Sequence, residues 1–559
     1  MVPEALERLV AAMADPGFYP HRPDRVEHLQ THISHVFLAG PYVYKLKKPV
    51  RFSFLDFGTA ARRRHFCEEE VRLNSRLAPG VYLGVVPITA APDGRFMLHG
   101  EGDPVAQVVW MRRLPTERML VPLLERGEVQ PALIERLAGH LAAFHASVAS
   151  GPEIAAHAEP AALRVRCEEN AAAALPFVGE LLAAEDHEIL ADFGPSFIAR
   201  HETLLRTRQA GGHIRDGHGD LHAEHVCDLD VALPARDGLP AVAPGLYVFD
   251  CLEFSPALRA CDVASEVAFL AMDLDRLGHH DLAARFVNAY VAASADQDVT
   301  LLLPFYASYR AGVRGKVESL KSAEVEVAED ERAAAARRAT DYWALAARYC
   351  WQAGDPVVIV CCGLSGSGKS ALAGKLALAT GFGLVSTDAL RRRASGTSTP
   401  VAYDAGGYAQ AARDATYAQL LDEMDRTLAA GRGIIVDATF ARRAHRDDLA
   451  RIVRQHRRRH VFAWCQADEA TVHERLDART LASLSDARWE TYVGQRAALQ
   501  PLAVDEPTIE VDTDGELAHA RASAIRALWS WRRGRLAVSG PSSTGDGSRP
   551  QPRRPGIVR

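Results

Sequence analysis

The chain has 559 residues, of which 48% are hydrophobic and 24% are charged, and its formal net charge is −6. Such a composition is that of a soluble globular protein, and the length predicts about three domains, because a single core rarely serves more than ~300 residues. The acidic balance disfavours a dedicated duplex nucleic-acid binder, since such domains tend to be basic. The longest apolar runs are far shorter than the ~20 residues that a membrane-spanning helix needs.

The first residues, MVPEALERLV, carry acids early and do not show the charged-then-apolar pattern of a secretion signal. Nine cysteines are scattered along the chain and no two of them form a CxxC pair, which argues against a zinc ribbon or a disulfide framework. We therefore expect reduced, mostly buried cysteines in a cytoplasmic protein.

The segment from about 25 to 115 is predicted to form a small β-rich lobe. Strand-like patterns run over 31–39 and 42–56, with a Gly-Pro turn signal at 40–41 between them. A helical segment rich in Arg and Glu follows at 60–77. Three further strand-like pieces, VYLGVVPI, GRFMLHG and PVAQVVWMRRL, complete this lobe.

The segment from about 116 to 345 is predicted to form a larger, helical lobe, because Ala and Leu recur there with helical periodicity. Only 211–254 differs, with the polar stretch GGHIRDGHGDLHAEHVC, a loop and then GLYVFDCLEF. Residues 316–350 are predicted to form a long Ala-, Glu- and Arg-rich helical stretch, a connector that packs on the helical lobe and ends at an Ala-Gly-Asp-Pro break. We expect 1–345 to be one two-lobed domain.

From 356 to 535 the pattern changes to strands that alternate with helices, beginning with VVIVCC and continuing through GLVSTD, GIIVDATF, HVFAWCQA and TIEVDT. This alternation predicts a parallel α/β sheet with crossover helices. The remaining residues, 536–559, are rich in Gly, Ser and Pro and lack periodicity, so we expect them to be disordered.

The sequence GLSGSGKS at 363–370 lies between the apolar, β-branched run at 357–362 and a helical pattern. A phosphate-binding P-loop requires this strand–loop–helix context, in which backbone N–H groups and a helix N-terminus face the phosphates. Lys369 would reach the β- and γ-phosphates, and the Ser370 hydroxyl would bind Mg²⁺. The alternative is an ordinary glycine-rich turn. We expect ATP and Mg²⁺ as cofactors, held at Gly363, Ser365, Gly366, Gly368, Lys369 and Ser370.

Features after the P-loop favour a kinase over a motor or a switch. Asp388 follows a strand and would accept the proton of a substrate hydroxyl, while Arg391 would bind a phosphate or carboxylate of the acceptor. Asp437 ends the apolar strand GIIVD and would hold Mg²⁺. Arg475 and Arg479 lie four residues apart on one helix face and could close over the phosphates. Asp388 could instead cap a helix, and the three arginines could be ordinary surface residues.

These residues are similar to the motifs of a known group of kinases. Residues 356–535 resemble the AAA-domain-type small P-loop kinases, which include polynucleotide kinase-like and gluconate kinase-like enzymes. The D-x-x-R step at 388–391 is similar to that of the 5′-hydroxyl polynucleotide kinases, and V-D-A-T-F at 436–440 fits the same group. The resemblance implies a kinase with Lys369 and Asp388 in catalysis, and it does not name the acceptor.

A second candidate centre combines HGDLH at 218–222 with YVFD at 247–250. Polar loops at strand ends that each carry a carboxylate suit phosphoryl transfer, because one carboxylate can accept a proton and the other can bind Mg²⁺. Upstream, Lys45 lies inside an alternating strand and three glutamates at 68–70 lie in the next helix. A strand lysine paired with a helix glutamate is the arrangement of protein kinases. Alone, the HGD triplet also fits a structural turn.

The order of these features resembles the aminoglycoside phosphotransferase-like kinase family over roughly 30–330. The resemblance implies that Asp220 is the catalytic base and Asp250 the metal aspartate. It also implies that Lys45 binds phosphate with Glu70 as its partner.

This sequence departs from the family pattern at two places. His225 occupies the position of a metal-binding asparagine, and imidazole prefers softer ions than Mg²⁺. No G-x-G-x-x-G loop precedes Lys45. We keep His225 as a candidate metal ligand, and a glycine-rich phosphate cover is not expected.

The tandem order resembles bacterial proteins described as bifunctional aminoglycoside phosphotransferase/ATP-binding proteins, a likeness also carried by YKLKKPVRFSFLDF and FDCLEF. It implies a two-lobed protein-kinase-like fold followed by a P-loop NTPase α/β sheet. The expected function is ATP-dependent phosphoryl transfer to the hydroxyl of an unidentified small molecule or nucleotide end. An alternative is a regulatory protein with a P-loop ATPase and a pseudokinase. A third reading, less favoured by the acidity, has 391–393 and 442–446 form a basic groove for nucleic-acid ends.

Overall fold

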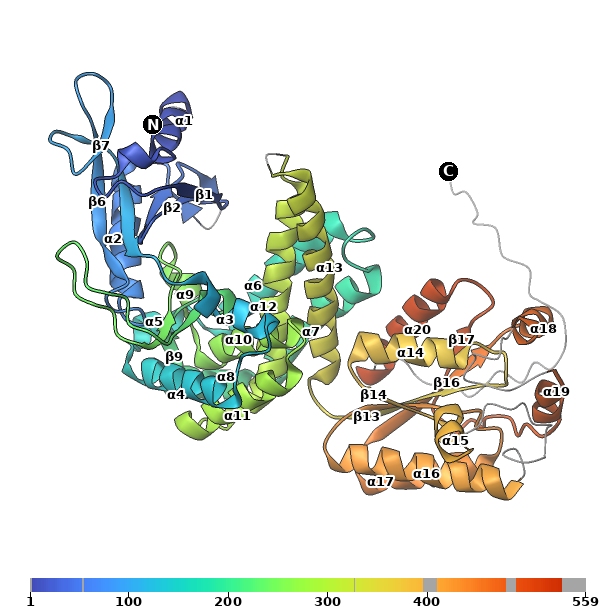
Figure 1. The fold of residues 1–559 in the computed structure, drawn as a ribbon. Coiled ribbons are helices and arrows are strands. Elements are labelled where there is room, and N and C mark those ends of the chain that lie inside the picture. The colour runs from blue at the N-terminus through green and yellow to red at the C-terminus, as the bar shows by residue number, and fades with distance from the viewer. Residues whose placement is uncertain (1–2, 53–54, 326, 396–409, 479–488, 535–559) are drawn as a thin grey trace, which may run out of the picture. The chain divides into compact units, whose positions relative to one another are not determined.

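The structure is a computed structural model that describes residues 3–52, 55–325, 327–395, 410–478 and 489–534 (Figure 1). The predicted disordered tail, 536–559, lies outside the described residues, and so does Arg479.

The chain forms two compact units, each with its own core. The first comprises Met1–Leu182 and Leu190–Ala346, and the second comprises Ala183–Ile189 and Ala347–Arg559. The predicted domain bounds, 1–345 and 356–535, stay a prediction.

The small lobe of the first unit is an antiparallel sheet between two helices. Leu9 and Met13 of α1 share a cluster with one face of the sheet, and Cys67 of α2 shares a cluster with the other. The sheet order is β1-β2-β3-β8-β6-β7. The elements are α1 (Pro3–Met13), β1 (Val26–Gln30), β2 (Ser34–Ala39), β3 (Tyr42–Lys47), β4 (Arg51–Phe52), β5 (Leu55–Asp56), α2 (Ala60–Asn74), β6 (Tyr82–Ala90), β7 (Phe96–Leu98) and β8 (Pro104–Arg112).

The alternation of β3 decides which side chains face α2. Side chains of a strand point to opposite faces in turn. Tyr42, Tyr44 and Leu46 therefore face the α1 side, where they join its apolar cluster. Lys45 and Lys47 face the α2 side, so the sheet places two lysines against one helix.

The larger lobe of the first unit is helical and is built around α10 (Val263–Arg276). Every residue of α10 from Val263 to Leu274 is buried, which explains why this helix lacks a polar stripe. Two short antiparallel pairs, β9 (Ile214–Asp216) with β12 (Ala260–Asp262) and β10 (Val226–Leu229) with β11 (Gly245–Val248), carry the polar loops. The other helices are α3 (Leu120–Glu125), α4 (Pro131–Ser147), α5 (Pro152–Ala156), α6 (Pro160–Ala174), α7 (Ala184–Arg200), α8 (Glu202–Ala210), α9 (Pro256–Arg259), α11 (His280–Ser294), α12 (Asp298–Ala323) and α13 (Glu329–Gln352).

The predicted helical stretch over 316–350 consists of two separate helices, α12 and α13, on either side of 324–328. Lys321 lies in the last turn of α12, and the first turn of α13 is acidic. Each end therefore carries the charge that its helix dipole favours. Lys321 Nζ also contacts Glu331 Oε1 at 2.6 Å across the break. The two-lobed, protein-kinase-like arrangement of the unit agrees with the prediction.

The second unit contains a five-stranded parallel sheet in the order β14-β15-β13-β16-β17, which confirms the predicted α/β class. The central strand β13 is wholly buried. The order of the strands changes direction at β13, and ligands of open α/β sheets bind beside the carboxyl ends at such a point. The elements are β13 (Val357–Cys362), α14 (Lys369–Thr380), β14 (Gly383–Ser386), α15 (Thr387–Ser395), α16 (Gln410–Ala429), β15 (Ile434–Asp437), α17 (Arg443–Gln455), β16 (Arg459–Gln466), α18 (Glu469–Asp477), α19 (Trp489–Ala497), β17 (Thr508–Asp512) and α20 (Leu517–Arg532).

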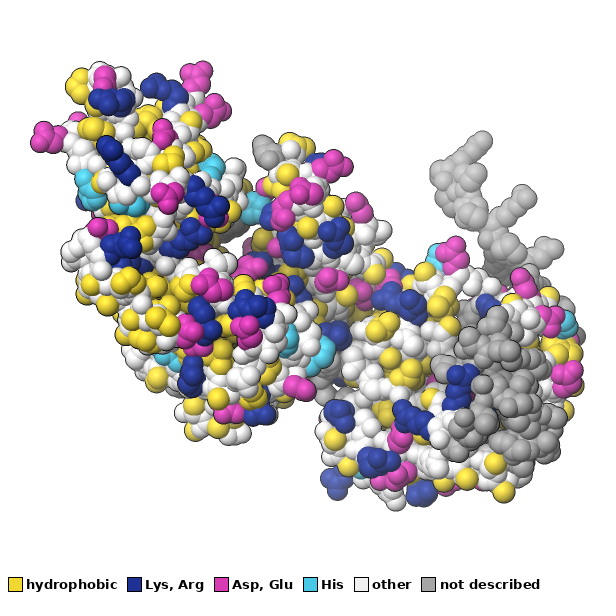
Figure 2. Space-filling model, in the orientation of Figure 1, with side chains coloured by type: hydrophobic (Ala, Val, Ile, Leu, Met, Phe, Trp, Pro, Cys, Tyr) yellow, Lys and Arg dark blue, Asp and Glu magenta, His cyan; other side chains and the backbone are white. Residues whose placement is uncertain are grey.

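All nine cysteines lie among the described residues, and seven of them are buried, which confirms that most are buried. Within the described ranges, no helix has both the length and the apolar character that crossing a membrane requires. On the face shown in Figure 2, basic and acidic side chains are interspersed.

Candidate active sites

The P-loop of the second unit is shaped by glycines that no other residue could replace without strain. Gly366 has φ +86°, and a Cβ there would lie 2.7 Å from Val472 Cγ1. A Cβ on Gly363 would lie 2.6 Å from the carbonyl oxygen of Cys465. Both glycines are needed because a side chain at either position would clash with these neighbours. The loop leads directly into α14, so its backbone N–H groups lie at the N-terminus of that helix.

Two charged groups of the P-loop region are buried at the same edge of the sheet. Lys369 opens α14 and is 9% exposed. Asp437 ends β15, is 4% exposed and pairs in register with Cys361 of β13. Burial raises the pKa of Asp437, and the charge of Lys369 opposes that rise.

Asp437 fits the role of a metal ligand. Its Oδ1 atom is buried and has no hydrogen-bond partner among the described residues. A buried carboxylate oxygen without a partner is costly, and a hard divalent cation such as Mg²⁺ would satisfy it. Ser370, the other predicted Mg²⁺ ligand, lies one residue after Lys369 in the first turn of α14.

Asp388 and Arg391 are in contact with each other in the first turn of α15. Arg391 Nη2 lies 2.7 Å from Asp388 Oδ1. Because α15 begins at Thr387, Asp388 is not its capping residue. Asp388 also raises the pKa of Asp437 through its charge, so the two carboxylates share one neighbourhood.

Arg475 lies beside the P-loop and donates hydrogen bonds to backbone carbonyl groups. It donates to the carbonyl oxygens of Thr513 at 2.5 Å and Gly366 at 3.5 Å. The guanidinium therefore supports the loop from α18. Its predicted partner Arg479 is outside the described residues.

Gln495 of α19 is a P-loop neighbour that sequence reasoning missed. Its Oε1 atom accepts a hydrogen bond from the Ser365 N–H group at 2.8 Å. The two residues are 130 positions apart, and no spacing rule connects them.

The arginines of the suggested basic groove are largely paired within the unit. Arg446 is 1% exposed and contacts Glu506 at 2.6 Å. Arg443 contacts Asp505 at 2.8 Å. The groove at 442–446 is thus weaker than the sequence suggested, because Arg446 cannot reach a nucleic acid from inside the fold.

In the first unit, β3 and α2 bring Lys45 to two carboxylates. Lys45 Nζ lies 2.9 Å from Glu70 Oε1 and 2.5 Å from Asp250 Oδ1. Of the three glutamates at 68–70, only Glu70 is buried. Burial opposes ionisation of Glu70, but the charges of Lys45 and Lys47 hold its pKa below the usual range.

Lys47 and Glu253 extend this charged group and were missed from the sequence. Lys47 Nζ contacts Glu70 Oε2 at 2.6 Å and also contacts Glu253 Oε1. Both side chains are buried, and burial raises the pKa of Glu253. Alternation along β3 is the signal that could have placed Lys47 beside Lys45.

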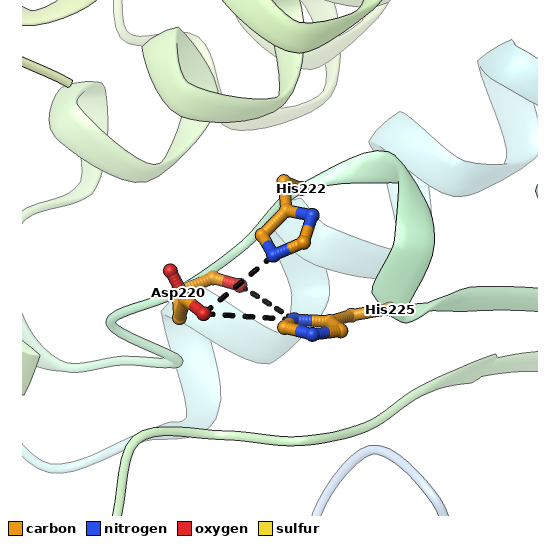
Figure 3. A group of neighbouring side chains, drawn as sticks. All are labelled: Asp220, His222 and His225. Atoms are coloured by element: carbon orange, nitrogen blue, oxygen red, sulfur yellow. Dashed lines mark hydrogen bonds and ion pairs between the residues drawn. The ribbon is translucent and has the colours of Figure 1, made fainter. Parts of the chain in front are cut away.

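The HGD loop places Asp220 among histidines (Figure 3). His222 Nε2 lies 3.6 Å and His225 Nδ1 lies 3.9 Å from Asp220 Oδ2. His225 Nε2 lies 3.6 Å from Asp250 Oδ2. Burial raises the pKa of Asp220, yet the charges of His222 and His225 hold it well below its usual range. The structure thus brings Asp220, Asp250, His225 and Lys45 into one centre, and it adds His222.

Glu266 of α10 fixes the HGD loop and carried no sequence signal. It accepts hydrogen bonds from the His218 N–H at 2.7 Å, from the Gly219 N–H and from His145 Nε2 at 2.8 Å. Burial raises its pKa, but His145 and the loop contacts lower it to about 2. The ionised, buried carboxylate of Glu266 therefore holds the HGD loop in place.

The donors of the first unit do not fit Mg²⁺ as well as those of the second. Mg²⁺ prefers oxygen ligands, and His225 offers an imidazole where the sequence resemblance implies an asparagine. The Lys45 ammonium group also contacts Asp250 Oδ1, so it already balances the charge of a carboxylate that would otherwise attract Mg²⁺.

Residues 358–502 match the AAA domain family model. Uncharacterized proteins of Mycobacterium tuberculosis and Mycobacterium bovis are each 33% identical over 508 residues, which cover 90% of this chain and 95% of each relative. The chain belongs to their family. The match is long enough to include parts of both units, so the family joins an AAA domain to a large N-terminal unit.

Solved structures also resemble the chain at low identity. A choline/ethanolamine kinase family protein from Mesorhizobium loti is 14% identical and has a TM-score of 0.35. The alignment covers 60% of this chain and 94% of that protein. A sugar kinase from Janibacter is 22% identical, with a TM-score of 0.26 and cover of 31% and 95%.

Proposed function

We propose that the chain is an ATP-dependent phosphotransferase with two kinase-like centres. The observation that carries the proposal is the buried, unpartnered Oδ1 of Asp437 at the sheet edge where the P-loop begins. A phosphoryl-transfer site needs an anion cradle, a metal ligand and a proton acceptor together. The P-loop, Asp437 and Asp388 supply these three.

In the second unit, the P-loop N–H groups and Lys369 would hold the β- and γ-phosphates of ATP. Ser370 and Asp437 would hold Mg²⁺, which when bound offsets the negative charge of the phosphates. Asp388 would accept the proton of the attacking hydroxyl.

Arg391 supports a particular class of acceptor for the second unit. Its contact with Asp388 leaves the carboxylate partly neutralised. An acceptor that carries a phosphate or carboxylate would compete for the guanidinium, because such groups bind arginine bidentately. Binding of this acceptor would free Asp388 beside the hydroxyl. We therefore favour an anionic hydroxyl compound.

In the first unit, Lys45 would bind ATP phosphates while Glu70 orients it. Asp220 would accept the proton of a second acceptor, since its carboxylate is ionised. Asp250 lies close enough to Lys45 and His225 to complete this centre.

A regulatory function of the first unit is the second candidate. The observation that favours it is the direct contact of Lys45 with Asp250, which occupies two groups that a kinase uses for phosphate and metal. In that case only the second unit would turn over ATP.

The test is transfer of labelled γ-phosphate from ATP by the full chain to a pool of hydroxyl metabolites. We expect Lys369→Ala to abolish one set of products and Asp220→Asn to abolish another. Lys375→Ala, in the same helix α14 but exposed, is the matched control and should leave both sets unchanged. Products that neither Lys369→Ala nor Asp220→Asn removes would overturn the proposed centres. If Lys369→Ala removes products but Asp220→Asn removes none, the regulatory function of the first unit is favoured.

A further inference from the structure

Three side chains of the HGD loop form a set of metal donors that the proposed function does not use as such. Asp220, His222 and His225 each offer one ligand atom, and these atoms lie within 4.8 Å of one another (Figure 3). The donors come from one short stretch of chain, the loop between β9 and β10 and the 3₁₀ turn Ala223–His225 within it.

The separations of these donors are those of ligands around one ion. His222 Nε2 lies 3.6 Å from Asp220 Oδ2, a distance that is too long for a hydrogen bond. One ligand atom from each of the three residues lies within 4.8 Å of the other two. Ligands at ~2.0–2.1 Å from a tetrahedral ion lie ~3.4 Å apart. A small movement of the side chains would therefore bring all three to a common ion.

The loop that carries the donors is held from several sides. Besides the contacts of Glu266, the Ala223 N–H donates to Asp273 Oδ2 at 3.0 Å. Arg310 Nη1 donates to the Gly219 carbonyl oxygen at 3.0 Å. His222 is 4% exposed and lies against the ring of Phe269. Such preorganisation favours metal binding, because little conformational freedom remains to be lost.

His225 also has the outer contact that orients metal-binding histidines. Its Nδ1 lies 2.9 Å from the Asp220 carbonyl oxygen, which can only accept, so Nδ1 carries the proton in this contact. The lone pair is then on Nε2, which lies 3.6 Å from Asp250 Oδ2. Asp250 is thus available as a fourth donor.

We propose that Asp220, His222 and His225, with Asp250 as a further donor, bind a divalent transition-metal ion of the zinc type in preference to Mg²⁺. Two imidazoles with carboxylates suit Zn²⁺ and similar ions, whereas Mg²⁺ prefers oxygen donors. This inference deepens the function proposed for the first unit and rests on it for the role of the centre.

The experiment uses the full chain, stripped with a chelator and kept free of nucleotide. Zn²⁺ is titrated in competition with a chromophoric chelator, Mg²⁺ is titrated by calorimetry, and Co²⁺ is added as an optical probe. We expect one equivalent of Zn²⁺ that binds at least 100-fold more tightly than Mg²⁺, and visible Co²⁺ bands typical of imidazole ligation.

His225→Asn and His222→Gln should each weaken Zn²⁺ binding at least 10-fold, and His225→Asn should strengthen Mg²⁺ binding. His519→Gln is the matched control, because His519 is exposed on α20 of the second unit, and it should change neither affinity. The Co²⁺ spectrum of the wild-type chain gives an answer even if a variant fails to fold.

Equal affinity of the wild-type chain for Zn²⁺ and Mg²⁺, or Zn²⁺ binding unchanged in both variants, would overturn the inference. Failure of the function proposed for the first unit would give a different experimental result from failure of this inference. Asp220-dependent transfer supported by Mg²⁺ without tight Zn²⁺ binding would overturn only the inference. Tight Zn²⁺ binding with no Asp220-dependent transfer in any metal would support the inference and overturn the kinase role of the first unit.

Discussion

Arg391 contacts Asp388 at 2.7 Å within one turn of α15, so the two residues assigned to the acceptor compensate each other's charge. In the proposed mechanism, an anionic acceptor would break this ion pair before Asp388 could accept a proton. The pair makes the two residues separable by experiment, because one should govern acceptor binding and the other proton transfer.

Arg391→Ala should raise the KM for the acceptor of the second unit at least 10-fold and change kcat much less, since it removes a binding contact. Asp388→Asn should lower kcat by about 10²–10⁴-fold, the usual contribution of a general base. Steady-state kinetics with the acceptor found in the transfer screen measures both. An Arg391→Ala variant with unchanged KM would contradict the assigned role, and Arg391→Lys should restore part of the affinity.

Glu70→Gln should destabilise the first unit by about 1–3 kcal/mol, because it weakens one contact of each of two buried lysines, which keep Asp250 and Glu253 as partners. Urea denaturation of the full chain measures the change. The matched control is Glu68→Gln, since Glu68 is exposed and forms an ion pair with Arg64 of the same helix. We expect that control to stay within about 0.5 kcal/mol of the wild type.

Gly366→Ala should disable the P-loop, because the new Cβ would meet Val472 at 2.7 Å and the residue would keep φ +86°. The readout is ATP-induced protection of the 357–380 peptide from hydrogen exchange, which should disappear. Gly374→Ala is the control, since a Cβ there meets nothing within 4 Å. That variant should keep the protection and gain up to ~1 kcal/mol of stability as a helical residue. Loss of protection in both variants would show that the effect is not local to Gly366.

Acidification should destabilise the second unit through His460 of β16. Burial and the charge of Arg454 lower the pKa of His460 to about 4 in the folded chain, whereas an unfolded histidine has a pKa of ~6.5. Between these values the unfolded chain binds more protons, so stability rises with pH and is lost as the pH falls from 7 to 5. His460→Gln should flatten this dependence by about 1–2 kcal/mol in urea denaturation. His519→Gln, at an exposed histidine, should keep the wild-type slope; identical slopes for His460→Gln and the wild type would refute the prediction.

Much of the second unit could be predicted because its signals are local. The P-loop glycines, the preceding strand and Lys369 lie within one short segment, and the strand–helix alternation fixes a parallel sheet. The contact between Asp388 and Arg391 also follows from their i, i+3 spacing on a helix, although it was not predicted.

The partners that were missed are distant in sequence and follow no repeat. Gln495 reaches Ser365 across 130 positions, and Glu266 reaches His218 across 48. Such contacts depend on how α19 and α10 pack, which hydrophobic periodicity does not specify. Resemblance to a kinase family assigned Lys45, Glu70 and Asp250 to one centre, but it gave no reason to expect a second lysine at position 47.

The charged group of the first unit is a linear series of alternating signs, from Asp250 through Lys45, Glu70 and Lys47 to Glu253. Each inner member contacts two neighbours of opposite charge, so the loss of one removes an ionic contact from both of its neighbours. Single replacements should then be selected against more strongly than paired ones. Among relatives of this chain, these five positions should vary together or remain fixed together.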